Sequence, residues 1–181
     1  MADHPFLELR TSRLILRRFR PSDARELQAY RADPEVARYQ SWDPAYSLEE
    51  AEAFTESVSR ATPGTPGEWF QFAAVSATTG HLIGDAGLRT DAEDPGLFEL
   101  GLTISAAHQR QGYAVEMATA VISYAFTTLA TVTFQAITHA RNEASIRTLE
   151  HLNFTRTETN DAVFKGEECQ EHTYELTAPE R

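Results

Sequence analysis

One short segment carries the residue types that a phosphate-binding loop needs. Gln109, Gly112 and Ala114 follow the spacing Gln-x-x-Gly-x-Ala, and Arg110 lies between the first two. Gly112 has no side chain, so a ligand can approach the backbone closely, and the free N–H groups of a first helical turn attract an anion such as a pyrophosphate. The same spacing also fits an ordinary strand-to-helix loop, so its weight depends on the flanking elements.

The elements on both sides of this loop are of the required kind. Residues 98–104 predict a strand before it. After it, apolar residues from Ala114 to Leu129 recur at spacings of three and four, which predicts the strongest helix of the chain. The helix dipole and the charge of Arg110 both favour a bound anion. An anion site between a strand and a helix N-terminus is therefore the preferred interpretation.

A second polar segment follows the next strand and supports the first. The β-branched and apolar run 131–138 predicts a buried strand, and His139 and Asn142 come directly after it. Asn142 can cap a short helix that carries Ser145. Asn153 stands where helices often end in a left-handed residue.

The rest of the chain predicts a mixed α/β sheet. Asp23 with Glu26, and Ser47 with Glu50, mark two helix starts of the capping-box type. Further strands are predicted over residues 14–16, 69–75, 81–88, 154–164 and 169–176. The order is one strand, two helices, a meander of strands and then β-α-β-α-β-β, which indicates an α/β fold. We expect one domain over residues 1–181.

The charge balance limits the classes of partner. Acidic residues outnumber basic ones by 27 to 16, for a formal net charge of −11. A nucleic-acid binder needs a basic face, so nucleic acid is not expected, whereas a cationic substrate such as a protonated amine would be attracted. The N-terminus resembles no export signal and no stretch is typical of a membrane span. We therefore expect a cytoplasmic protein without a membrane partner.

Together the two polar segments resemble the GNAT superfamily of N-acetyltransferases. The first is similar to the acyl-CoA pyrophosphate loop of that family, and the second to its Asn-x-x-Ser helix, with Asn153 in place of the usual glycine. Shorter matches resemble the RimJ/RimL-like branch: Thr11–Arg17, Asp23–Ala24, Asp33–Val36, Trp42 with Pro44, Glu99–Gly101 and Gly112–Glu116. Leu102, where that branch often has an aromatic residue, and the tail from Lys165 depart from its pattern.

This resemblance implies a GNAT fold, with a mixed, mostly antiparallel sheet of about seven strands flanked by about four helices. It implies acetyl-CoA as co-substrate and a primary amine as acceptor, either a protein N-terminal α-amine or a small-molecule amine. A homodimer is left open. One alternative is a non-catalytic acyl-CoA-binding module, and another is an unrelated nucleotide-phosphate-binding α/β domain, although no phosphate-loop Gly-Lys-Ser/Thr occurs.

The resemblance also implies roles for individual residues. Glu99 would act as the base, directly or through water, and Ser145 would donate a proton to the departing sulfur; a surface ion pair and helix capping are the structural alternatives. The expected cofactor contacts come from three segments: Leu102, Thr103 and Ile104, then Gln109, Arg110, Gln111, Gly112, Tyr113 and Ala114, and finally Asn142. A backbone N–H around Thr103 to Ser105 would polarise the thioester carbonyl. Tyr39, Trp42 and His139 are expected at the acceptor, with His139 as a second candidate base; core aromatic residues and a structural histidine are the alternatives.

Neither a metal nor a covalent acetyl-enzyme is expected. The six histidines include no pair at the i, i+4 spacing of a helical zinc site. Cys169 is the only cysteine, which excludes an intramolecular disulfide and a thiolate cluster. Nothing in the sequence marks Cys169 as an activated nucleophile, and an acyl thioester is reactive enough for direct attack by an amine.

Overall fold

A computed structural model describes residue 6, residues 8–129 and residues 131–178. Its strands form one eight-stranded sheet in the order β1-β2-β3-β4-β5-β6-β8-β7. The strands are β1 (Glu8–Arg10), β2 (Leu14–Arg18), β3 (Trp69–Ser76), β4 (Leu82–Thr90), β5 (Leu97–Ile104), β6 (Thr133–His139), β7 (Thr155–Phe164) and β8 (Glu167–Thr177). The α-helices are α1 (Ala24–Arg31), α2 (Pro34–Ala37), α3 (Leu48–Ser59), α4 (Tyr113–Thr128) and α5 (Glu143–His151).

The observed architecture confirms the expected α/β fold and adds two short elements. Among the described strands only β5 and β6 pair in parallel, so the sheet is mixed and mostly antiparallel as predicted. The expected numbers were about seven strands and four helices. The additional strand β1 has three residues and the additional helix α2 has four, too few for either to show a periodic pattern.

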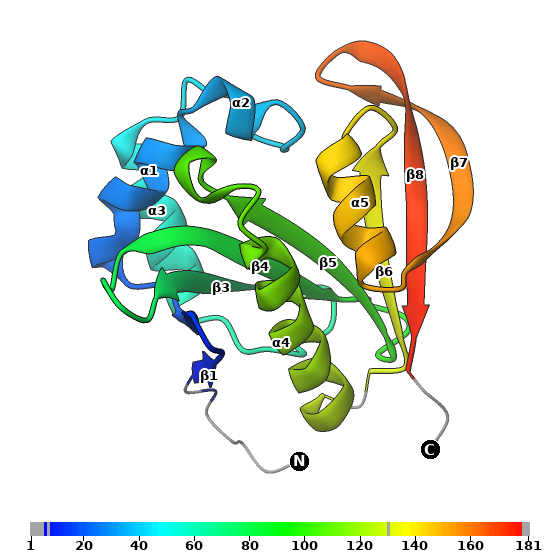
Figure 1. Cartoon of the computed structure of the whole chain (residues 1–181), viewed down its shortest axis with the longest axis horizontal. Coiled ribbons are helices and arrows are strands. Elements are labelled where there is room, and N and C mark those ends of the chain that lie inside the picture. The colour runs from blue at the N-terminus through cyan, green and yellow to red at the C-terminus, as the bar shows by residue number, and fades with distance from the viewer. Residues whose placement is uncertain (1–5, 7, 130, 179–181) are drawn as a thin grey trace.

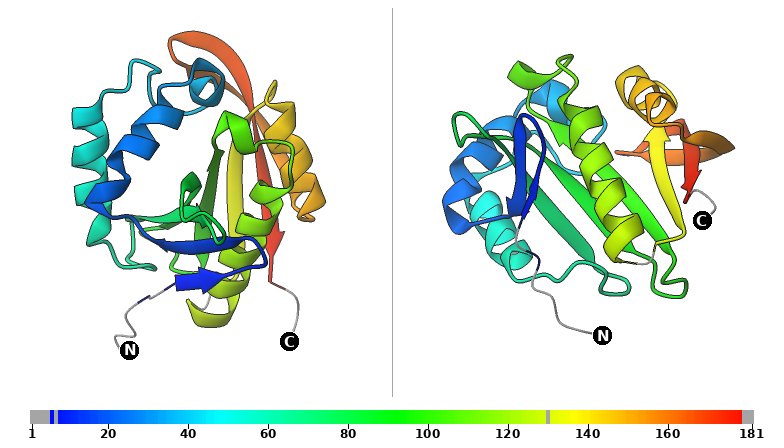
Figure 2. Two further views of the ribbon diagram at one scale, coloured as in Figure 1. Left: turned by 60° about the vertical axis from the view of Figure 1, so that its left-hand side comes forward. Right: turned by 60° about the horizontal axis from the view of Figure 1, so that its bottom comes forward.

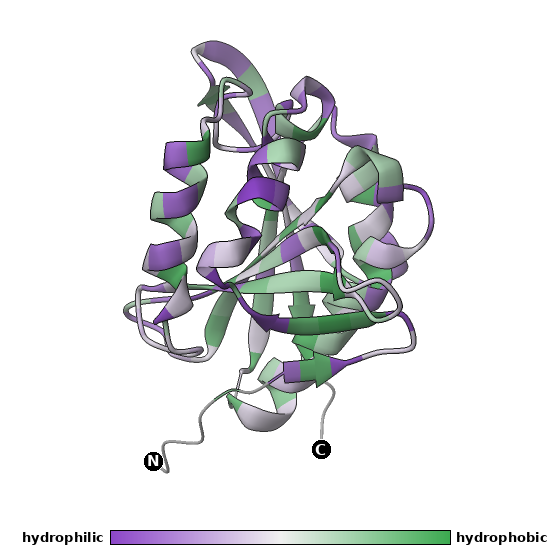
Figure 3. Ribbon diagram, turned by 90° about the vertical axis from the view of Figure 1, so that its left-hand side faces the viewer, coloured by the Kyte–Doolittle hydropathy of each residue, from purple (hydrophilic) through white to green (hydrophobic). Residues whose placement is uncertain are grey.

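The sheet lies between two helical layers (Figures 1 and 2). Helices α4 and α5 cover one face, where the core includes Phe72, Phe98, Met117 and Val121. Helices α1 and α3 pack on the other face, in a second core that involves only β2, β3 and β4. Figure 3 shows the same division: the middle of the sheet is largely green, and purple residues recur along the helices. The part of the second face formed by β5, β6, β8 and β7 therefore has no helix of the α1–α3 layer packed on it.

Strands β5 and β6 pair over only a short length. The whole segment Phe98–Ile104 of β5 is paired with β4. Its pairing with β6 covers only Leu97–Glu99, opposite Thr133–Gln135. Figure 1 shows the two strands meeting at the lower end of the sheet and separating toward the top. The upper part of β5 thus has an edge that β6 does not occupy.

Both predicted helix starts are observed, but only the one at Ser47 has the predicted side-chain cap. The Ser47 hydroxyl accepts from the Glu50 N–H at 3.1 Å, and the Glu50 carboxylate accepts from the Ser47 N–H at 2.7 Å, as in a capping box. Helix α1 does begin after Asp23, but Asp23 does not cap it with its side chain. Asp23 already has a helical backbone at the end of a 3-10 turn (Pro21–Asp23), and its buried carboxylate instead binds the Arg17 guanidinium at 2.7 Å and accepts from the Arg20 N–H at 2.8 Å. Glu26 pairs with His81.

The last residue of α1, Arg31, is a buried charged group that the sequence did not predict. The Arg31 guanidinium is 4.2 Å from the centre of the Trp42 ring and 4.1 Å from that of Phe54. One of its nitrogens lies 3.8 Å from a carboxylate oxygen of Asp85 on β4, and the Tyr30 hydroxyl donates to the same carboxylate. Burial raises the pKa of Asp85, while Arg31 and the Tyr30 hydrogen bond act in the opposite direction. This cluster fastens α1 and the loop after α2 to the sheet.

Candidate active site

The loop between β5 and α4 has the backbone shape of an anion site. A short 3-10 turn (Ala106–His108) precedes it, and Gly112 caps α4 with a left-handed φ of 80°. A Cβ at Gly112 would meet only Arg13 Nη2, at 3.5 Å, so steric crowding is not the reason that a glycine is needed here. The left-handed conformation is the reason, since it turns the chain so that the first N–H groups of α4 point outward.

The loop glutamines bond to the loop itself. Gln109 Nε2 donates to the Ile104 carbonyl at 3.0 Å, and Gln111 Nε2 donates to the Ala107 carbonyl at 3.0 Å. Arg110 is exposed and also has a left-handed φ, of 59°. The side chains of Gln109 and Gln111 therefore hold the loop in shape, which leaves the backbone N–H groups and Arg110 to face an anion.

A brace joins this loop to the turn before β2. The Arg13 side chain binds the Glu116 carboxylate at 2.6 Å, donates to the Gln111 carbonyl at 2.9 Å and lies over the Tyr113 ring. Burial alone would raise the pKa of Glu116, but hydrogen bonds from Thr11, Ser12 and Arg13 lower it to about 2. Two segments that each resembled the RimJ/RimL-like pattern, about a hundred residues apart, are thus in direct contact.

The free edge of β5 presents alternate backbone groups. The Ser105 N–H donates to Ile83 on β4, so the N–H of Thr103, two residues earlier, also points to β4. The groups of Leu102 and Ile104 point the other way: the Leu102 carbonyl accepts from Gln40 Nε2 at 3.2 Å and the Ile104 carbonyl from Gln109. A ligand beside this edge would therefore meet the N–H groups of Leu102 and Ile104, and not that of Thr103.

Glu99 lies on the sheet face opposite α4, at the point where β5 and β6 separate. Its neighbours Phe98 and Leu100 belong to the core under α4, so Glu99 and Gly101 project from the other face. The Glu99 carboxylate is 3.4 Å from the Arg89 guanidinium, and both side chains are partly exposed. Glu99 can thus reach solvent and an incoming substrate while remaining next to a cation.

His139 is held between aromatic rings and is oriented by the backbone. Its ring centre is 5.0 Å from that of Tyr39, and the Tyr39 hydroxyl donates to the Arg141 carbonyl at 3.2 Å. The Arg141 N–H donates to His139 Nδ1 at 3.0 Å, so a neutral ring carries its proton on Nε2. In this arrangement His139 offers a hydrogen-bond donor and not a base.

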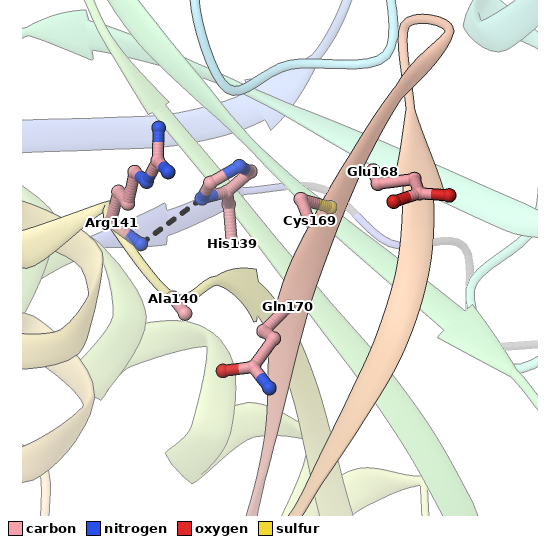
Figure 4. Close-up of a pocket in the computed structure, with 6 residues that line it drawn as sticks. All are labelled: His139, Ala140, Arg141, Glu168, Cys169 and Gln170. Atoms are coloured by element: carbon pink, nitrogen blue, oxygen red, sulfur yellow. Dashed lines mark hydrogen bonds between the residues drawn. The ribbon is translucent and has the colours of Figure 1, made fainter.

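A hollow of about 440 Å³ lies beside His139, close to the tip of the β7–β8 hairpin (Figure 4). It is lined by His139, Ala140, Arg141, Glu168, Cys169 and Gln170, and Glu99 is not among its lining residues. The tip of the same hairpin is fastened to the α2 region, because Lys165 Nζ donates to the carbonyls of Ala37 and Trp42 at 2.9 and 2.7 Å. Sequence reasoning missed this contact, since nothing near Lys165 marks its partners.

Asn142 and Ser145 begin α5, on the face that α4 covers. The Asn142 side-chain carbonyl accepts from the Ser145 N–H at 3.2 Å and so caps the helix, as predicted. Among the described residues the Ser145 hydroxyl has no hydrogen-bond partner. Ser145 and Glu99 therefore lie on opposite faces of the sheet. Trp42 lies apart from both, in the cluster around Arg31, where its indole N–H donates to the Arg31 carbonyl at 3.1 Å.

This geometry agrees with what the chain resembles in known proteins. The family model of the acetyltransferase (GNAT) domain matches residues 13–155. The chain belongs to the GNAT family. A curated relative, the uncharacterized N-acetyltransferase YoaA of Bacillus subtilis, is 31% identical over 152 residues, which cover 84% of each chain. The protein is accordingly an acetyl-CoA-dependent N-acetyltransferase.

Two solved structures have the same fold and different acceptors in their descriptions. One is RimL, a ribosomal L7/L12 alpha-N-protein acetyltransferase in complex with coenzyme A, with a TM-score of 0.79, 16% identity and coverage of 94% of this chain and 97% of that one. The other is spermidine N-acetyltransferase from Vibrio cholerae in complex with CoA and spermine, with a TM-score of 0.79, 19% identity and coverage of 92% and 96%. At these identities the likeness establishes the fold alone.

Two further findings concern the described residues. No helix among them is long and apolar enough to cross a membrane. Within the same ranges no three His, Cys, Asp or Glu side chains are grouped so that they could hold a metal ion. That no metal takes part in the reaction remains a prediction.

Proposed function

We propose that this enzyme acetylates a primary amine by direct attack on acetyl-CoA, at the place where β5 and β6 separate. The observation that carries the proposal is the position of this separation. It begins at Glu99 and ends beside the loop before α4, so a ligand along the β5 edge would join the two. One end of the site would then be suited to phosphate and the other to an amine.

The residues present fit acetyl-CoA in two places. The pyrophosphate would bind the loop of Gln109, Arg110, Gln111, Gly112, Tyr113 and Ala114, mainly through its backbone N–H groups and Arg110. The pantetheine arm would lie along the free edge of β5 at Leu102 and Ile104, next to Asn142 on α5. There an amide N–H of the arm would replace the Gln40 side chain as the hydrogen-bond donor to the Leu102 carbonyl. Thr103 would contribute packing only.

The chain's own groups would perform the proton transfers. Acetyl-CoA supplies an activated thioester, so the enzyme needs to deprotonate the amine, stabilise charge on the carbonyl oxygen and protonate the sulfur. Glu99 would accept the amine proton, directly or through a water molecule. A backbone N–H of Leu102 or Ile104 would donate to the carbonyl oxygen. Ser145, on the opposite face and with a free hydroxyl, would donate toward the sulfur.

The acceptor would approach from the face on which Glu99 lies. Tyr39 and His139 border this face, and His139 Nε2–H would orient a carbonyl or hydroxyl of the acceptor. Trp42 is left out of the proposal because its ring covers Arg31. The described neighbours include enzymes for a protein N-terminus and for a polyamine, so the fold by itself does not select an acceptor.

Release of free thiol from acetyl-CoA, measured with a panel of primary amines, tests this proposal. We expect amine-dependent release, with the acetylated product identified by mass spectrometry. A protein that binds CoA but releases no thiol with any amine would instead be a non-catalytic acyl-CoA-binding module. Activity should survive EDTA, and Cys169→Ala should keep a kcat close to that of the wild type. An acetylated Cys169 that turns over on adding amine would contradict direct attack.

A further inference from the structure

Two exposed apolar side chains lie on the sheet face that carries Glu99. The large hydrophobic side chains that the described residues expose are Trp69, Val132, Ile137 and Val163, with exposed fractions of 37%, 57%, 47% and 72%. Trp69 and Ile137 both project from the face that carries Glu99. Trp69 alternates with Phe70 and Phe72, and Ile137 with Phe134 and Ala136, which all belong to the core under α4.

The strand register aligns these residues across the sheet. Trp69 pairs with Arg89, Arg89 with Glu99, and Glu99 with Gln135. The next row on the same face begins with Gln71, which pairs with Gly87. An indole ring at the end of one row and a carboxylate two strands away thus lie on one continuous surface.

Two glycines form the floor of this surface. Gly87 and Gly101 pair with each other across β4 and β5. A Cβ at Gly87 would lie 2.9 Å from the Trp69 ring, so the ring rests directly on this glycine. A Cβ at Gly101 would meet only Trp69 atoms, at 3.9 Å, so Gly101 leaves open space next to Glu99. We call Trp69, Gly87 and Gly101 the apolar shelf, and Ile137 on β6 lies on the same face beyond the point where β5 and β6 separate.

The charges around the apolar shelf favour a cation at one end. Glu171 pairs with His139 and Glu175 with Gln135, so both carboxylates project from the same face as Glu99. Arg89 offsets the charge of Glu99, which leaves the face acidic as a whole. A protonated amine would be attracted to this face, while an apolar group attached to it would be desolvated against Trp69.

We infer that the acceptor is a primary amine with an apolar substituent, which lies on the apolar shelf while the nitrogen lies at Glu99. This inference rests on the proposed acetyl transfer and narrows its substrate class. Trp69 would be a specificity-determining residue, because its ring supplies the largest area of the shelf and also stacks favourably on an aromatic substituent. Position 101 would need a residue without a side chain, because a methyl group there would occupy the space next to Glu99.

Steady-state kinetics with two pairs of acceptors test this inference. 2-Phenylethylamine and a short peptide beginning with phenylalanine carry the apolar group, and distinguish a small molecule from a protein N-terminus. Ethanolamine and a peptide beginning with serine are their polar counterparts. We expect the wild type to prefer at least one apolar acceptor over its polar counterpart by tenfold or more in kcat/KM.

Substitutions separate the shelf from the catalytic groups. Trp69→Ala should raise the KM for the preferred apolar acceptor about tenfold, with kcat and CoA affinity nearly unchanged. Gly101→Ala should also raise this KM, because the added methyl has room in the fold but not beside a bound substituent. Val163→Ala removes another exposed apolar side chain, on β7, and should leave the kinetics unchanged.

The outcomes distinguish this inference from the proposed function. If no amine supports thiol release, the proposed function fails and the inference falls with it. If amines are acetylated but the polar acceptors are preferred, or Trp69→Ala leaves the KM for apolar acceptors unaltered, the inference alone is wrong. The inference is supported if Trp69→Ala has a higher KM for the apolar acceptor, an unchanged CoA affinity and an intact far-ultraviolet circular dichroism spectrum.

Discussion

The two ends of the site are built in different ways. The loop before α4 is one contiguous segment, and in the proposed site it would act mainly through its backbone: Gly112 sets its conformation, and Gln109 and Gln111 bond to nearby carbonyls. The proposed acceptor face is assembled from four strands and from the segment after α2, and it would act through side chains such as Glu99 and Trp69.

This difference has a physical consequence for tolerance to change. A backbone site depends on one dihedral angle and on a helix end, so most side chains there can vary without loss of anion binding. A side-chain site depends on register, since a shift of one residue would move Glu99 to the other face of the sheet. The cofactor end should therefore be robust to substitution except at the glycine, and the acceptor end should be sensitive at each position that projects from its face.

The largest effect is expected at Glu99. Glu99→Gln removes the proton acceptor but keeps the size of the side chain, so kcat should fall roughly a hundredfold to ten-thousandfold with unchanged CoA affinity. Glu52→Gln, an exposed change of the same kind on α3, should have no effect. A kcat within threefold of the wild type would mean that Glu99 is only the partner of Arg89.

The next effect concerns the scaffold of the acceptor side. Asp85→Ala leaves the Arg31 guanidinium buried without its carboxylate, so the free energy of unfolding should fall by about 3–5 kcal/mol in urea denaturation. Adding Arg31→Met, which replaces the cation by an apolar chain, should recover part of this loss. If the double variant is less stable than the single one, the ion pair is not what holds α1 to the sheet.

A smaller effect is expected at the cofactor end. Gly112→Asp introduces a carboxylate and a side chain at a left-handed position, so CoA affinity measured by calorimetry should fall at least tenfold, about 1.4 kcal/mol. Thr119→Asp adds the same charge on an exposed position of α4 and serves as the control. Unchanged CoA affinity in a folded Gly112→Asp variant would remove this loop from the proposed site.

The smallest effect is a dependence of stability on pH at the brace. Because the pKa of Glu116 is lowered from 4.5 to about 2, its ionised form stabilises the folded state fully above pH 4.5 and progressively less as the pH falls toward 2. Glu116→Gln should therefore cost about 1–2 kcal/mol near pH 7, and the gap from the wild type should narrow in acid. Urea unfolding at several pH values measures it, and a gap that does not narrow would contradict the brace.

Local sequence patterns predicted helices well where the apolar spacing extended over several turns or a capping motif marked the helix end. The spacing of apolar residues from Ala114 onward is that of a helix on one core face, and the Ser47 box and Asn153, with its left-handed φ of 63°, lie at helix ends as expected. The Asp23 cap was wrong because Arg17, six residues away on β2, competes for the same carboxylate. Such competition is invisible to a rule that considers only neighbours on one helix.

Local sequence patterns were enough to predict the fold class, the loop before α4 and the helix cap at Asn142, because each depends on residues close together in the chain. The tertiary structure brings distant groups together: Glu99 projects from the sheet face opposite Ser145, Arg13 braces Glu116 beside the loop before α4, and the Trp69 ring rests on Gly87 next to Gly101. These contacts join residues tens of positions apart. They follow from sheet register and from the early separation of β5 and β6, which no local period encodes.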